Sequence, residues 1–85
     1  MEHELAVSVN NKKQMSDALN TQGVSFAIRG TYSKAIDYYT KSLKMREELG
    51  DKRGIATSLF NIGAIYHEQG NLANAIEYYL SLIHI

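Results

Sequence analysis

Apolar residues recur at steps of three and four along most of the chain, which is the spacing of one face of an α-helix. The stripes comprise Met15, Leu19, Gly23 and Phe26, with the polar Gln22 on the same face, then Ala35, Ile36, Tyr39, Leu43 and Leu49, then Ile55, Leu59, Ile62, Gly63 and Tyr66, and a fourth that begins at Leu72. This pattern predicts helices over about residues 12–29, 32–49, 52–69 and 72–83. We therefore expect an all-α fold.

A glycine followed by a polar residue separates the predicted helices. Glycine accepts the left-handed conformation that ends a helix, and a short polar side chain then caps the next one. The pairs are Gly30-Thr31, Gly50-Asp51 and Gly70-Asn71. We expect each to form a tight turn whose second residue is the helix cap.

Asn10-Asn11 stands at the corresponding place before the first predicted helix, and we expect a break there. Residues 1–10 are then an N-terminal flank. Two interpretations stay open for this flank, the remnant of a preceding helix and a frayed tail.

The second half of the chain repeats the first at an offset of 40 residues. The repeat predicts two structural units, over residues 11–50 and 51–85, and a fixed period with turn glycines in register indicates a repeat array. The identical pairs are Lys12/Lys52, Leu19/Leu59, Gly23/Gly63, Gly30/Gly70, Ala35/Ala75, Ile36/Ile76, Tyr38/Tyr78 and Tyr39/Tyr79.

Residues 11–79 resemble the tetratricopeptide repeat (TPR) family in its longer, 40-residue form. That family carries a large apolar residue, a glycine and an aromatic residue on its first helix, then a small and an aromatic residue on its second. The matching residues are Leu19, Gly23, Phe26, Ala35 and Tyr39 in one copy and Leu59, Gly63, Tyr66, Ala75 and Tyr79 in the other. The proline that the family places after the second helix is missing, because the chain contains no proline.

The resemblance implies antiparallel helix pairs stacked as a short right-handed α-solenoid, and a chain that is a fragment of a longer array. A glycine inside a helix costs about 1 kcal/mol relative to alanine. Gly23 therefore indicates close approach of a neighbouring helix, and Ala35 is the small residue that suits this contact.

The internal match ends at Tyr79, where the first copy continues TKSLKM and the second reads LSLIHI. Leu82 stands where the first copy has Ser42, a place at which the family keeps a small residue for close packing. LSLIHI is also the translation of a common sequencing adapter, so we interpret Leu80–Ile85 as non-native. The alternative is a genuine apolar C-terminal turn.

The amino-acid composition argues against several classes of function. Nine basic and nine acidic residues give a net charge of zero, which argues against a nucleic-acid or anionic-membrane surface. The chain has no cysteine, and no apolar run reaches the 18 or so residues that span a bilayer. The N-terminus does not read as a signal peptide, so a cytoplasmic location is the default. His3, His67 and His84 have no metal-ligand spacing, and we expect no enzyme activity, metal or cofactor.

The function that the resemblance implies is a protein-interaction module, which binds a peptide in the concave groove lined by the first helix of each repeat. Phe60 is the sharpest candidate, because it cannot face the same core as its neighbour Leu59, and the Asn61 amide could hold a peptide backbone. The expected groove residues are Asp17, Asn20, Val24, Ala27, Thr57, Phe60, Asn61, Ala64 and His67.

The carboxylate clamp of chaperone-binding TPR proteins is not expected, since only Asn61 matches its pattern. Two alternatives to peptide binding remain. One is a structural role, either as an internal spacer or as a segment that associates with itself through uncapped ends, because repeat arrays usually need polar terminal caps. The other is the sensory array of a larger bacterial regulator.

Overall fold

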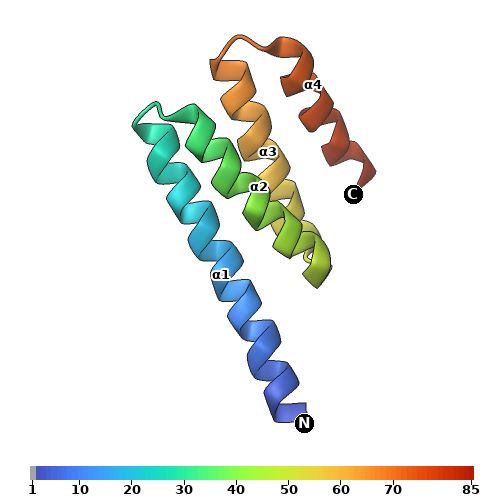
Figure 1. Cartoon of the computed structure of the whole chain (residues 1–85). Helices are drawn as coiled ribbons and strands as arrows, with labels where there is room; N and C mark the ends of the chain where they lie inside the picture. The colour runs from blue at the N-terminus through green and yellow to red at the C-terminus, as the bar shows by residue number, and fades with distance from the viewer. Residues whose placement is uncertain (1) are drawn as a thin grey trace.

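The computed structural model describes the backbone of residues 2–85 and the side chains of residues 10–85. Its elements are α1 (Glu2–Ile28), α2 (Tyr32–Leu49), α3 (Lys52–Glu68), α4 (Leu72–Ser81) and a short 3₁₀ helix, η1 (Leu82–His84). Consecutive helices run antiparallel and lie side by side, so that α1 and α3 point the same way (Figure 1). The expected all-α fold is confirmed, and α2, α3 and α4 begin where the sequence pattern placed them.

The expected break at Asn10-Asn11 is wrong, because α1 begins at Glu2 and continues through both residues. Among the described residues, a left-handed φ is confined to Gly30, Gly50 and Gly70. An asparagine inside a helix costs only about 0.7 kcal/mol relative to alanine, less than the loss of the helix's own hydrogen bonds. Residues 2–10 thus extend the first helix, and Met1 of the predicted flank lies outside the described residues.

The three turns follow the predicted pattern, with φ of 78°, 67° and 77° at the glycines. The Asp51 carboxylate accepts a hydrogen bond from the Gly54 backbone N–H at 3.0 Å, and the Asn71 side chain accepts one from Asn74 N–H at 3.3 Å. Thr31 occupies the cap position without such a bond, so its predicted capping role is wrong. Its backbone angles are close to those of the other two caps, so the difference lies in the side chain and not in the backbone.

The core lies between α2 and α3. Ala35, Tyr39, Ile62 and Ile65 form its buried cluster. Tyr39 also fills the space in front of Gly23, where an added Cβ would lie 2.6 Å from the ring. The predicted close approach at Gly23 is therefore confirmed, but the nearest atoms belong to Tyr39 rather than to Ala35. Tyr79 lies in the same way 2.7 Å from the position of a Cβ on Gly63.

Ser42 lies where α2 packs closely against its neighbours, as its small size predicted. It is fully buried, and its hydroxyl donates to the Ser16 carbonyl of α1 at 2.7 Å. At the corresponding place in the second copy, Leu82 is half-buried and begins η1, because α4 ends at Ser81. The second copy of the helix pair is therefore shorter than the first.

Candidate protein-interaction surface

A cavity of about 320 Å³ that is open to solvent lies between the parallel helices α1 and α3, near their C-terminal ends. We call it the apolar cavity. Tyr39 of α2 is among its lining residues, so the central core residue also faces this space. Burial raises the pKa of the Tyr39 hydroxyl above its ordinary value. The lining comprises Val24, Ala27, Ile28, Tyr32, Tyr39, Asn61, Ala64, Ile65 and Glu68.

A second space, of about 240 Å³, lies nearer the N-terminal end of α3. We call it the polar cavity, since charged side chains from α1, α2 and the start of α3 surround it. The lining comprises Lys13, Asp17, Arg46, Asp51, Arg53, Gly54 and Thr57. The α1–α3 face is thus apolar towards one end and charged towards the other.

Asn20 and Asn61 join α1 and α3 by a hydrogen bond, in which Asn61 Nδ2 donates to Asn20 Oδ1 at 3.0 Å. In sequence Asn20 lies between the α1 residues of the two cavities, and Asn61 is the α3 residue of the apolar cavity that comes next after Thr57 of the polar cavity. A carboxamide offers two donor hydrogens and an acceptor oxygen with two lone pairs. Both side chains therefore keep hydrogen-bonding capacity beyond the bond that they share.

The structure brings together most of the nine residues that were expected to line a groove. Val24, Ala27, Asn61 and Ala64 line the apolar cavity, while Asp17 and Thr57 line the polar cavity. Asn20 touches Asn61 between them.

Phe60 and His67 are exposed and line neither cavity. The ring of Phe60 lies 6.0 Å from that of Tyr79, at the α4 side of α3. The strongest single candidate from the sequence therefore lies apart from the face between α1 and α3.

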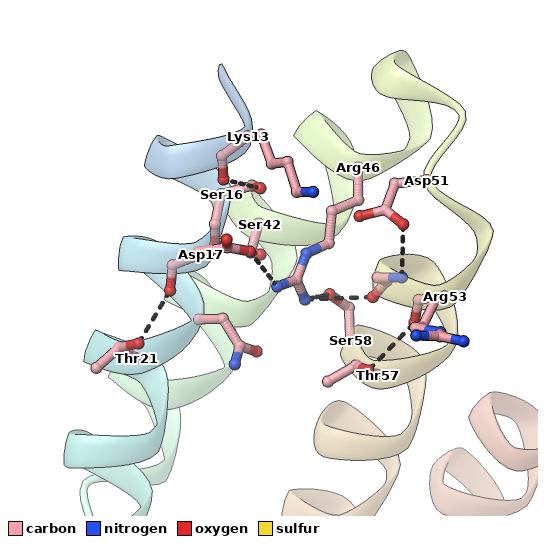
Figure 2. Close-up of polar contacts among 12 residues, drawn as sticks. Lys13, Ser16, Asp17, Thr21, Ser42, Arg46, Asp51, Arg53, Thr57 and Ser58 are labelled. Atoms are coloured by element: carbon pink, nitrogen blue, oxygen red, sulfur yellow. Dashed lines mark hydrogen bonds and ion pairs between the residues drawn. The ribbon is translucent and has the colours of Figure 1, made fainter. Parts of the chain in front are cut away.

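Arg46 is a central residue that the sequence analysis missed. Its side chain is 6% exposed and extends from α2 between α1 and α3 (Figure 2). Nη1 donates to the Gly54 carbonyl at 3.2 Å and to Ser58 Oγ at 2.9 Å, and Nη2 donates to Asp17 at 3.1 Å. Arg46 thereby connects three helices at the wall of the polar cavity.

A signal for Arg46 was present in the sequence. The buried residues of α2 are Ala35, Tyr39, Ser42 and Arg46, which continue one line at steps of four, three and four. The predicted apolar stripe of this helix passes through Leu43 and leaves Arg46 out, because an arginine is almost never fully buried unless it is paired. Its partners come from α1 and α3, and their distance from Arg46 could not be read from the helical spacing of α2 alone.

In the part of the chain that the structure describes, no group of three or more histidine, aspartate or glutamate side chains could hold a metal ion. None of the helices found in the same residues is long and apolar enough to cross a membrane.

Curated relatives with the same repeats are proteins named Photosystem I assembly protein Ycf3. The one from Rippkaea orientalis is 34% identical over 70 residues, which cover 82% of this chain and 39% of the relative. The one from Cyanophora paradoxa is 30% identical over 71 residues, covering 84% of this chain and 39% of the relative. The chain thus spans about two fifths of the length of these relatives.

The sequence profile of the tetratricopeptide repeat family matches residues 14–83. This range takes in both helix pairs, the three glycine turns and the two Gly–Tyr contacts described above. The chain belongs to the tetratricopeptide repeat family.

Proposed function

We propose that this chain is a protein-interaction module and that an extended segment of a partner protein binds along the face between α1 and α3. The observation that carries the proposal is the arrangement of two cavities on one face, with the Asn20–Asn61 pair at the side of the apolar cavity that is nearer the polar cavity. A concave, mostly preformed site with a few well-placed polar groups is the usual form of a binding site. The exposed side chain of Val24 and the small side chain of Ala64 leave room for a partner residue.

The comparisons support this class of function. Stacked TPR helices form extended binding surfaces, and the relatives are named as assembly proteins. An assembly protein has to hold other proteins, so we propose that this repeat segment does the same in its parent protein. The partner's identity is not carried over from the relatives, because the chain spans only about two fifths of their length.

The test is selection of a random dodecapeptide display library on the immobilised chain, followed by titration of the enriched peptides by fluorescence polarisation. Ala64→Asp places a charge in the apolar cavity and should weaken peptide binding at least tenfold. Thr40→Asp introduces the same charge at an exposed position of α2 and serves as the matched control. Peptides that bind both variants like the wild type would refute binding at this face.

A second candidate function is self-association through α4. Leu72 and Ile76 are 56% and 55% exposed and lie one turn apart on α4, so they form an apolar face. Leu80 and Ile83 continue this face but belong to the segment that we interpret as non-native, so the candidate rests on the first two residues. In the first copy, Tyr32 and Ile36 stand at the positions of Leu72 and Ile76, and they pack against the core cluster. An apolar helix face of this kind favours association, because burying it removes apolar surface from water.

Sedimentation velocity over a wide concentration range tests this candidate. If α4 mediates association, the chain should sediment as a larger species at high concentration, and Ile76→Ser should restore a monomer. Ile28→Ser removes an equally large side chain that is 82% exposed at the end of α1, and it should leave association unchanged. A wild-type chain that remains monomeric throughout would rule the candidate out.

A further inference from the structure

We propose that the partner segment is an extended peptide carrying one acidic side chain and one large apolar side chain, separated by an even number of positions, about four or six. The inference rests on the proposed function and specifies the chemistry of the partner. The acidic side chain occupies the polar cavity and the apolar side chain occupies the apolar cavity. The Asn20 and Asn61 amides bind the peptide backbone between them.

The charges around the polar cavity favour an acidic ligand. Its lining contains three cationic residues, Lys13, Arg46 and Arg53, and two carboxylates. Both carboxylates are already engaged, since Asp17 accepts from Arg46 and Asp51 accepts from the Gly54 backbone N–H.

Lys13 and Arg53 are the cations that remain for a ligand. Among residues 10–85, the ion pairs are Lys12–Glu48 and Arg46–Asp17, so neither Lys13 nor Arg53 is paired. The N-terminal end of α3 adds a partial positive charge at the same place. A carboxylate bound here gains charge-assisted hydrogen bonds.

The apolar cavity favours an aliphatic or aromatic side chain. Val24, Ala27, Ala64 and Ile65 present aliphatic groups to it. Val24 is 38% exposed and Ile28 is 82% exposed. Burial of such surface against a partner's apolar side chain is favourable.

The distance between the cavities sets the spacing of the two side chains. Along α1, the polar-cavity residues Lys13 and Asp17 lie about 11 positions before Val24–Ile28, or about 16 Å at 1.5 Å per residue. The corresponding positions on α3 give a similar separation of about 16 Å. An extended chain covers that distance in about five residues at about 3.3 Å each, and its successive side chains point to opposite faces. Both anchors can enter the α1–α3 face only at an even spacing, so we expect them to lie about four or six positions apart.

The amides between the cavities favour an extended partner over a helical one. A carboxamide can pair with the N–H and C=O groups of a peptide that has no internal hydrogen bonds, whereas a helix has already satisfied these groups. A helical partner would also need about 11 residues to cover about 16 Å. The spacing of the two anchors therefore distinguishes the two kinds of partner.

The experiment starts from a groove-dependent peptide, defined as one whose binding is weakened by Ala64→Asp. Synthetic versions carry glutamate and leucine two, four, five, six and eleven positions apart, in both orders, on a serine–glycine background of constant composition. Each is titrated by fluorescence polarisation at low and moderate salt. We expect a spacing of about four or six to bind at least tenfold tighter than a spacing of two or five in one of the two orders.

Charge reversal tests the polar cavity independently. The double variant Lys13→Glu/Arg53→Glu should bind the preferred peptide at least tenfold more weakly. It should bind more tightly a version of the peptide in which lysine replaces the glutamate. Lys41→Glu/Lys44→Glu makes the same change in net charge at exposed positions of α2 and serves as the control. Tighter binding at a spacing of eleven would overturn the extended peptide in favour of a helix. If groove-dependent peptides bind equally well with and without their acidic residue, this inference is overturned but the proposed function stands. If no groove-dependent peptide is obtained, both are overturned.

Discussion

The ring of Tyr39 occupies the space that a side chain at Gly23 would need. A Cβ on Gly23 would lie 2.6 Å from both Cδ1 and Cε1 of the ring, a distance that normal packing does not allow. Tyr39 is only 3% exposed and belongs to the core cluster, so the ring cannot move aside. The contact fixes how closely α1 and α2 pack.

Gly23→Ala should destabilise the chain by about 1–2 kcal/mol, because the steric cost of overpacking exceeds the gain in helix propensity. Gly63→Ala is the matched variant of the second copy. Tyr79 is only half-buried there and lies near the end of α4, so its ring can shift and the cost should be below about 1 kcal/mol. Urea denaturation followed by circular dichroism measures both free energies of unfolding.

A second substitution separates the contact from other effects of losing glycine. In a Tyr39→Leu background, Gly23→Ala should cost less than it does in the wild type, because the leucine leaves room for the new methyl group. Equal costs in the two backgrounds would show that the Gly23–Tyr39 contact is not the cause.

The sequence predicted close packing at Gly23 but named Ala35 as its counterpart. Helical spacing shows that a residue faces a neighbouring helix, and it cannot tell whether a small side chain or a tilted ring fills the space. The fold was therefore predictable from glycine and aromatic positions that recur every 40 residues, while individual contacts were not.

Arg46 should contribute far more to stability than its ion-pair partner does. Arg46→Ala removes a buried side chain and leaves Ser58 and the Gly54 carbonyl without their donors, so we expect a loss of about 2–4 kcal/mol. The Asp17 side chain is 59% exposed, and Asp17→Asn should cost less than about 1 kcal/mol. Thermal unfolding of the two variants checks the order, and similar losses in both would contradict it.

The position of Arg46 also shows why the sequence predicted only part of the candidate site. Val24, Ala27 and Ala64 could be assigned to the α1–α3 face because they lie on the sides of the first helices that turn away from their partners. The position of the Arg46 side chain between α1 and α3 depends on the angles at which three helices pack, and so does the side of α3 on which Phe60 lies. The hydrophobic period of a single helix does not predict either position.

The three helix caps should contribute different amounts to the stability of the chain, although their positions are equivalent. Asp51→Ala removes a 3.0 Å hydrogen bond and a negative charge at the start of α3, and should cost about 1 kcal/mol. Asn71→Ala removes a 3.3 Å bond and should cost less, about 0.5 kcal/mol. Thr31→Ala removes no capping bond and should be close to neutral. Chemical denaturation of the three alanine variants tests the ranking, which a large effect at Thr31 would contradict.

Stability should fall in alkaline solution because of Tyr39. Burial raises the pKa of its hydroxyl above the ordinary value of about 10, and burial also raises that of Tyr78, with smaller effects from Tyr66 and Glu77. The folded state then holds these protons more tightly than the unfolded state. Their contribution is fully present below pH about 10 and is lost as the pH rises through the higher folded pKa.

Urea midpoints measured between pH 8 and 12 should therefore decline at the alkaline end, and Tyr39→Phe should reduce the decline. Tyr32→Phe, which also removes one phenol, is the matched control for composition. Tyrosinate absorbance of the native chain gives an independent reading, because the Tyr39 signal should appear at higher pH than that of the unfolded chain. A Tyr39→Phe variant with an unchanged alkaline slope would show that this hydroxyl does not cause the loss.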